Sequence, residues 1–192
     1  LMAFAVYAAV RYYKDFAATN YHLLDEQKRQ SDNLAHTLLP KHIASRVANH
    51  EETVAEWHPN TAVLYASVEG LDGLYKKMSA IQLVHLLSEI FLHFDKLAVN
   101  HGVDKVTTLG TNYVVATGID RQREPDYAAI AACALAMCQA VSEISTRTSS
   151  RLTLRAGIAA GQAVSGVIGE ARPCFDIWGE AVEQANRLRT VA

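Results

Sequence analysis

The residues at the ends of two predicted strands are the first place where this chain could do chemistry. Ser67 and Glu69 stand at the end of the apolar run 61–68, and Thr111 follows Gly110 in a predicted hairpin. Successive side chains alternate between the faces of a strand, so Ser67 and Glu69 share a face. Neither tip carries an aspartate. Hydroxyl groups are weak ligands for hard divalent cations, so Ser67 and Thr111 offer no strong anionic ligand.

Composition excludes several classes of function. The chain has 192 residues, is 50% hydrophobic and carries a net charge of −2, which gives no electrostatic basis for nucleic-acid binding. Its three scattered cysteines predict a reducing compartment rather than a disulfide framework. Cys133 and Cys138 lie in an alanine-rich run, so we expect both to pack in the core. No His or Cys has the spacing of a zinc site.

The N-terminal segment 1–20 is interpreted as the end of a membrane helix. Residues 1–10 are almost wholly apolar, and Arg11 and Lys14 follow them. Ten residues are too few to cross a bilayer, which needs about 20, so we expect a fragment that begins within such a helix. Basic residues favour the cytoplasmic side, which predicts a membrane protein with a cytoplasmic domain. An ordinary helix start is the alternative.

Segment 21–40 predicts a coiled-coil or signalling helix that Pro40 ends. Its seam has heptad spacing but includes polar members: Leu24, Gln27, Ser31, Leu34 and Leu38. A solvated linker helix is the alternative interpretation.

The remainder, 41–192, predicts one α+β domain of the ferredoxin-like split βαβ type. His58, Pro59 and Asn60 predict a turn before the first strand. Ser79 predicts the cap of a long helix, with an apolar stripe that includes Ile81 and Val84. In order, the expected elements are a strand 61–68, a helix 79–100, a hairpin 103–109 and 112–117, a helix 126–144, strands 152–159 and 162–168 with a tight turn at Gly161, and a helix 179–188.

Four segments resemble the catalytic domain of class III nucleotide cyclases, the adenylyl and guanylyl cyclases. They occur in the family's order and spacing: 63–71 (VLYASVEGL), 105–113 (KVTTLGTNY), 157–169 (GIAAGQAVSGVIG) and 175–188 (FDIWGEAVEQANRL). Leu38, Leu39, Pro40 and Ile43 are similar to the motif that precedes this domain. The resemblance covers about 38–188, and the family's last strands would follow Ala192.

The resemblance implies closure of a ribose 3′-hydroxyl onto the α-phosphate with loss of pyrophosphate. In the family, two magnesium ions bind to aspartates at adjacent strand tips of one domain. Those aspartates fall on Ser67 and Thr111, so the resemblance implies that this chain binds no catalytic metal by itself. We expect Mg²⁺ or Mn²⁺ to come from a partner cyclase domain at the dimer interface. Glu69 is a weaker candidate as a replacement ligand.

The resemblance also assigns the substrate contacts. The base-recognition pair falls on Thr107 and Asp176. Asp176 can accept a hydrogen bond from the exocyclic amino group of adenine, which favours ATP over GTP. The ribose-orienting asparagine falls on Glu183, a departure, while the arginine that stabilises the transition state falls on Arg187. A helix cap is the alternative role for Asp176, and a solvated helix face is the alternative for Arg187.

Three functions follow from these assignments. The leading one is the substrate-recognising half of a membrane-associated adenylyl cyclase that is inactive without a metal-binding partner. The second is a non-catalytic pseudocyclase that dimerises with a catalytic domain and regulates it, which Thr107 and Glu183 favour. The third is half of a guanylyl cyclase, which Asp176 disfavours.

Overall fold

The computed structural model describes residues 43, 46, 54–75, 77–120, 123–169 and 173–192. The chain divides into two units, Leu1–Glu51 and Glu52–Ala192. The predicted membrane segment 1–20 and coiled coil 21–40 lie outside the described residues, so both stay predictions.

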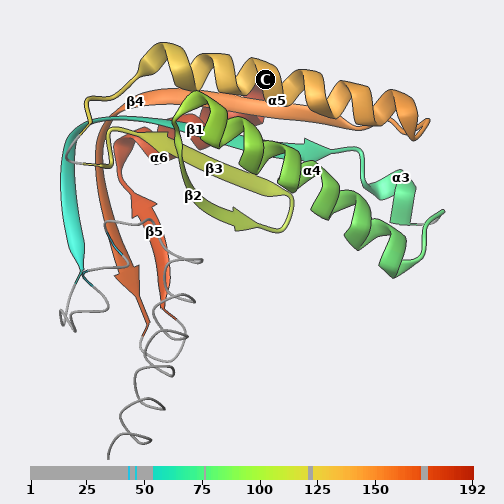
Figure 1. Ribbon diagram of the computed structural model, residues 1–192, viewed down its shortest axis with the longest axis horizontal. Helices are drawn as coiled ribbons and strands as arrows, with labels where there is room; N and C mark the ends of the chain where they lie inside the picture. The colour runs from blue at the N-terminus through green and yellow to red at the C-terminus, as the bar shows by residue number, and fades with distance from the viewer. Residues whose placement is uncertain (1–42, 44–45, 47–53, 76, 121–122, 170–172) are drawn as a thin grey trace, which may run out of the picture. The chain divides into compact units, whose positions relative to one another are not determined.

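The second unit is built on a five-stranded antiparallel sheet (Figure 1). Its strand order is β2-β3-β1-β4-β5, with every neighbouring pair antiparallel. This mixed architecture confirms the α+β prediction. The elements in chain order are β1 Ala55–Glu69, α3 Asp72–Tyr75, α4 Ala80–His101, β2 Asp104–Leu109, β3 Asn112–Thr117, α5 Tyr127–Arg147, β4 Thr153–Ile168, β5 Cys174–Trp178 and α6 Glu180–Val191.

Helices cover the two faces of the sheet differently. The main core lies between the sheet and helices α4 and α5, where Leu64 and Ala66 of β1 pack with Ile90, Phe94 and Met137. The intervening side chains of β1 face the other way, toward α6. There α6 packs closely on β4, with Ala181 and Ala185 fully buried. The residues expected to bind nucleotide lie on strands and on α6, so this second face positions the site.

Two local predictions about the long strands are wrong. The segment 58–60 is not a turn: β1 runs through it, and the register with β4 shifts between His58 and Thr61. Gly161 is not in a turn either, because β4 is continuous and pairs Gly161 with Thr61. The reason is that Pro and Gly also mark bulges and close approaches inside strands. Strand β5 and the short helix α3 were not predicted.

Helix α4 begins with the predicted Ser79 cap. Ser79 Oγ accepts a hydrogen bond from the Gln82 N–H at 3.3 Å, and Gln82 Oε1 accepts from the Ser79 N–H at 2.8 Å. These reciprocal bonds satisfy two otherwise unpaired donors. The apolar stripe is partly wrong, since Ile81 is 71% and Val84 61% exposed while Ile90 and Phe94 are buried.

Removing the Ser79 cap should weaken the domain. We expect Ser79→Ala to lower the free energy of unfolding by about 1 kcal/mol, because the Gln82 N–H loses its acceptor. Urea unfolding of the purified chain measures this. Ser88→Ala, at an exposed position within the same helix, is the matched control and should not destabilise the fold. Equal losses in the two variants would contradict a capping role.

The alanine-rich helix α5 is a core helix. It is long and apolar enough to cross a membrane by length and composition, but Ile130, Cys133 and Met137 are fully buried against the sheet. The packing prediction is right for Cys133, and burial raises the pKa of its thiol to about 11. It is wrong for Cys138, which is exposed. Helical periodicity decides this difference, because a step of five residues turns the side chain away from the core.

Candidate active site

Strand pairing brings the two expected strand tips together. Ser67 of β1 pairs with Asn112 of β3, which places Thr111 of the β2–β3 turn beside it. The Val68 N–H donates to the Thr111 carbonyl at 3.0 Å. The two side-chain hydroxyls, Ser67 Oγ and Thr111 Oγ1, lie 3.4 Å apart. Residues far apart in the sequence therefore share one small polar site.

The donor set at these tips does not fit a magnesium pair. Ser67 is 3% exposed, and its hydroxyl donates to Glu69 Oε1 at 3.2 Å. Glu69 is the single carboxylate here, and the remaining oxygens are neutral hydroxyls. Magnesium demands several hard oxygen ligands in octahedral geometry. Among the described residues, no cluster of three or more His, Cys, Asp or Glu side chains has the geometry of a metal site.

Arg189 is a residue of this site that sequence reasoning missed. Its guanidinium carbon lies 5.2 Å from the centre of the Tyr65 ring, and its Nη1 is 4.0 Å from Glu69 Oε1. Asn186 Oδ1 accepts hydrogen bonds from Arg189 Nε at 3.1 Å and Nη2 at 2.9 Å. The Arg189 side chain is 18% exposed. The family motif ends before this position, and only the three-residue spacing from Asn186 gave a local signal.

The other α6 residues of interest face solvent. Glu183 and Arg187 are both exposed and lie one turn apart on the helix. Neither belongs to the Arg189 cluster, so α6 presents two different surfaces. Its inner side contacts the sheet, and its outer side offers a carboxylate and a guanidinium to whatever binds there.

Asp176 lies on β5 and is half-buried. Its Oδ1 accepts a hydrogen bond from the backbone N–H of Ile177 at 2.9 Å. The N-cap of α6 is Gly179, which has no side-chain cap bond. The alternative role of Asp176 as the helix cap is therefore wrong. Its second oxygen is available for another donor, because a carboxylate has several acceptor positions.

Thr107 lies at the opposite edge of the sheet, on β2, and is half-buried. The sheet curls enough for the edge strands β2 and β5 to come into contact (Figure 1). The structure therefore brings together the two strands that carry the expected base-recognition pair. The register of β2 shifts between Lys105 and Thr107, so a bulge re-aims the side chains at this point.

A charged cluster anchors the β2–β3 hairpin to α4. Asp95 Oδ1 accepts hydrogen bonds from the Tyr113 hydroxyl at 2.6 Å and from Lys105 Nζ at 2.7 Å. Lys105 Nζ also lies 5.1 Å from the centre of the Tyr113 ring. Burial and the neighbouring Asp95 raise the pKa of Tyr113 well above its usual range, so this phenol stays protonated. The hairpin that carries Thr107 and Thr111 is thus tied to the core.

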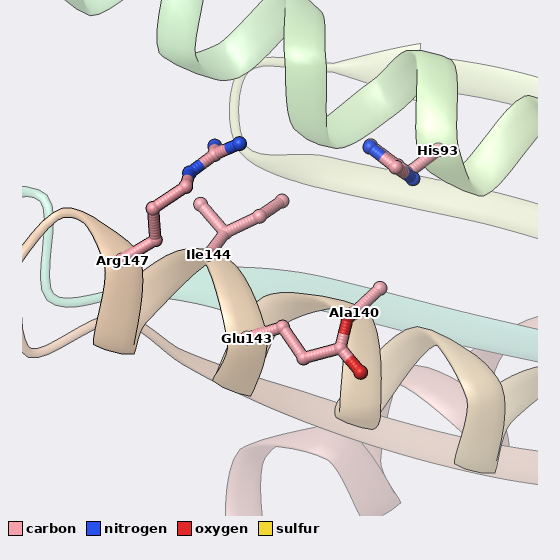
Figure 2. Close-up of a pocket in the computed structure, with 5 residues that line it drawn as sticks. All are labelled: His93, Ala140, Glu143, Ile144 and Arg147. Atoms are coloured by element: carbon pink, nitrogen blue, oxygen red, sulfur yellow. The ribbon is translucent and has the colours of Figure 1, made fainter.

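A separate groove lies between helices α4 and α5 (Figure 2). Its lining includes His93, Glu143 and Arg147, whose side chains come from both helices. Arg147 Nη2 donates to Glu89 Oε1 at 2.6 Å. None of the residues expected to bind nucleotide lines this groove, so it is distinct from the strand-tip site.

Comparisons with known proteins agree with this architecture. Residues 53–192 match the family model described as the adenylate and guanylate cyclase catalytic domain. An adenylate cyclase of Mycobacterium tuberculosis is 30% identical over 169 residues, covering 88% of this chain and 38% of that protein. Human atrial natriuretic peptide receptor 2 is also 30% identical, over 168 residues, covering 86% of this chain and 16% of the receptor.

A solved structure gives the same result. The catalytic core of a rhodopsin-guanylyl cyclase with converted specificity, in complex with ATPαS, superposes with a TM-score of 0.64. It is 26% identical, and the match covers 71% of this chain and 74% of that one. The chain belongs to the adenylate and guanylate cyclase catalytic-domain family. It spans well under half the length of the mycobacterial relative.

Proposed function

We propose that this chain is the substrate-recognising half of a membrane-associated adenylyl cyclase, which converts ATP to cyclic AMP and pyrophosphate. The observation that carries this proposal is the contrast between its two polar regions. At the strand tips, the Ser67 and Thr111 hydroxyls are engaged with each other and with Glu69. On α6, by contrast, Arg187 is exposed and free to contact a ligand held by another domain.

Each substrate contact has a physical role. Asp176 accepts a hydrogen bond from the exocyclic amine of adenine, and Thr107 adds one further hydrogen bond to the base. Arg187 stabilises negative charge that develops on the phosphates during ring closure. A guanidinium suits this task because it is always charged and presents several donors in a fixed plane. Glu183 is the contact that fits least well, because its carboxylate would face the phosphate charge.

The metal belongs to the partner in this proposal. Class III cyclases use Mg²⁺ or Mn²⁺, which supplies Lewis-acid chemistry when bound. Since the strand tips of this chain do not fit that metal, a second cyclase domain carrying both aspartates would hold it. The partner is on the same polypeptide or on another. The membrane association rests on segment 1–20 and its basic flank.

An assay of nucleotide turnover tests the proposal. The purified chain, incubated with Mn²⁺ and ATP or GTP, should produce no cyclic nucleotide. Mixing it with a catalytic domain that has both aspartates should give activity that prefers ATP. Cyclisation by the chain alone would contradict the proposal, and a preference for GTP would favour the guanylyl cyclase alternative.

A pseudocyclase is the second candidate, and the exposed carboxylate of Glu183 favours it. In that case the domain shapes or regulates its partner without touching the reacting nucleotide. The mixed complex would then be active, but its turnover would not depend on Arg187. The two functions therefore differ in one measurable quantity.

A further inference from the structure

We infer that Arg189 acts as a tethered cation at the strand tips, in the place where the family binds metal. The tethered cation is defined here as the Arg189 guanidinium together with its contacts to Tyr65, Glu69 and Asn186. Its positive charge opposes the binding of a divalent metal ion at the strand tips. The inference rests on the proposed function in one respect, the assignment of the family's metal positions to Ser67 and Thr111. It concerns the strand tips, whereas the proposed substrate contacts lie elsewhere in the domain.

The Glu69 carboxylate already has partners at the strand tips. Glu69 is the acidic side chain that points to the same face as Ser67. One of its oxygens, Oε1, accepts the Ser67 hydroxyl at 3.2 Å and lies 4.0 Å from Arg189 Nη1. A metal binding through Oε1 would have to displace this hydrogen bond, and a metal binding through either oxygen of Glu69 would approach a guanidinium. The metal and the guanidinium are like charges and repel each other. Water screens this repulsion in part, because the Glu69 side chain is 43% exposed while that of Arg189 is 18% exposed.

Several contacts hold the Arg189 side chain beside Glu69. Two hydrogen bonds to Asn186 Oδ1 fix the plane of the guanidinium. Its central carbon, Cζ, lies over the Tyr65 ring, which contributes a cation–π interaction. With its side chain 18% exposed, it is largely withdrawn from solvent. Asn186 is therefore a positioning residue for the tethered cation.

The packing of α6 against the sheet places Arg189 near the strand tips. Tyr65 pairs with Gly157 of β4, on the face that α6 covers. A Cβ on Gly157 would lie 2.4 Å from the Arg189 backbone nitrogen, so the helix touches the strand at this point. This close approach aims Arg189 along β1 toward Glu69. Replacing the two hydroxyl residues with aspartates would then leave a fixed positive charge beside the restored ligands.

The test measures Mn²⁺ binding by the purified chain without nucleotide or partner, using the electron paramagnetic resonance signal of free Mn²⁺. The wild type and Ser67→Asp/Thr111→Asp should bind Mn²⁺ weakly. Adding Arg189→Gln to the double variant should tighten binding by 10-fold or more. Adding Arg189→Lys should not, because the charge remains. The matched control adds Arg147→Gln instead, which removes an α5 guanidinium that pairs with Glu89, and should leave the affinity of the double variant unchanged.

Two outcomes would overturn the inference. One is tight Mn²⁺ binding by the double variant that retains Arg189, and the other is the same gain from the Arg147 control. A second measurement needs no substitution, so it holds even where a variant fails to fold. In the wild type, added Mn²⁺ should broaden the guanidinium nitrogen resonances of Arg189 no more than those of Arg147. Selective broadening at Arg189 would show metal beside Glu69.

This result is separable from the proposed function. Metal binding by the isolated chain is independent of whether Arg187 and Asp176 serve a partner's active site. A Mn²⁺ result that contradicts the role of Arg189 would not change the expected activity of the mixed complex. An inactive mixed complex would not change the expected Mn²⁺ affinities.

Discussion

Substituting Arg187 with alanine should lower the cyclase turnover of the mixed complex by 10-fold or more, which corresponds to about 1.4 kcal/mol of transition-state stabilisation. The effect should fall on kcat, because charge on the phosphates is greatest in the transition state. Stability should hardly change. Arg187 is exposed on α6, and surface substitutions of this kind usually change the free energy of unfolding by less than about 0.5 kcal/mol.

The matched control for Arg187 is Arg147→Ala. Arg147 is also an arginine near the C-terminal end of a helix, but it lies on α5 and pairs with Glu89. Steady-state rates of the mixed complex, with urea unfolding of each variant, separate chemistry from folding. Unchanged turnover in Arg187→Ala would remove the catalytic role and favour the pseudocyclase. Equal losses in both variants would point to a general effect of charge.

Substituting Gly157 with alanine should destabilise the domain by about 3 kcal/mol. The new Cβ would lie 2.1 Å from the Ala185 carbonyl oxygen and 2.4 Å from the Arg189 nitrogen. Both are backbone atoms of α6, so no side-chain rotation relieves the overlap and the whole helix must move. Overpacking of this kind costs about 1–3 kcal/mol, and backbone contacts belong at the upper end.

Gly161→Ala is the control for Gly157, four residues along the same strand and under the same helix. Its Cβ would meet the Ala181 nitrogen at 3.6 Å, an ordinary contact. We expect a change of less than about 1 kcal/mol, since alanine also lowers the entropy of the unfolded chain. Midpoints of urea unfolding at equal slope measure both variants. If both unfold like the wild type, the close packing of α6 on β4 is not a constraint.

The displacement of α6 should also reach the site. Both Arg187 and Arg189 lie on the part of α6 that packs beside Gly157. A helix moved outward would separate Arg189 from Tyr65 and change the position of Arg187 relative to β5. Packing at one glycine therefore links the stability of the domain to both polar regions.

The main elements of the fold were readable from local sequence signals. The Ser79 cap, the hairpin at Gly110 and the alanine-rich helix all depend on residues within a few positions of one another. Gly161 shows the limit of such signals. Glycine is common both in turns and inside strands that something approaches closely, and only the pairing with Thr61 selects the second.

The candidate site divides in the same way. The prediction of weak metal binding rests on the residue types at Ser67 and Thr111, because the chemistry of a hydroxyl does not depend on the fold, and it stays a prediction. Their mutual contact and the engagement of Glu69 required the sheet register. The role of Arg189 could not be predicted from its spacing to Asn186 alone, because it depends on the close approach of α6 to Gly157.

The sequence by itself determined which functional groups this domain has, since side-chain chemistry is a property of each residue. Tertiary structure alone decided which of those groups meet, since contacts between distant strands and helices follow from packing. The Arg189 guanidinium could therefore be assigned to the strand tips only from the packing of α6 on the sheet.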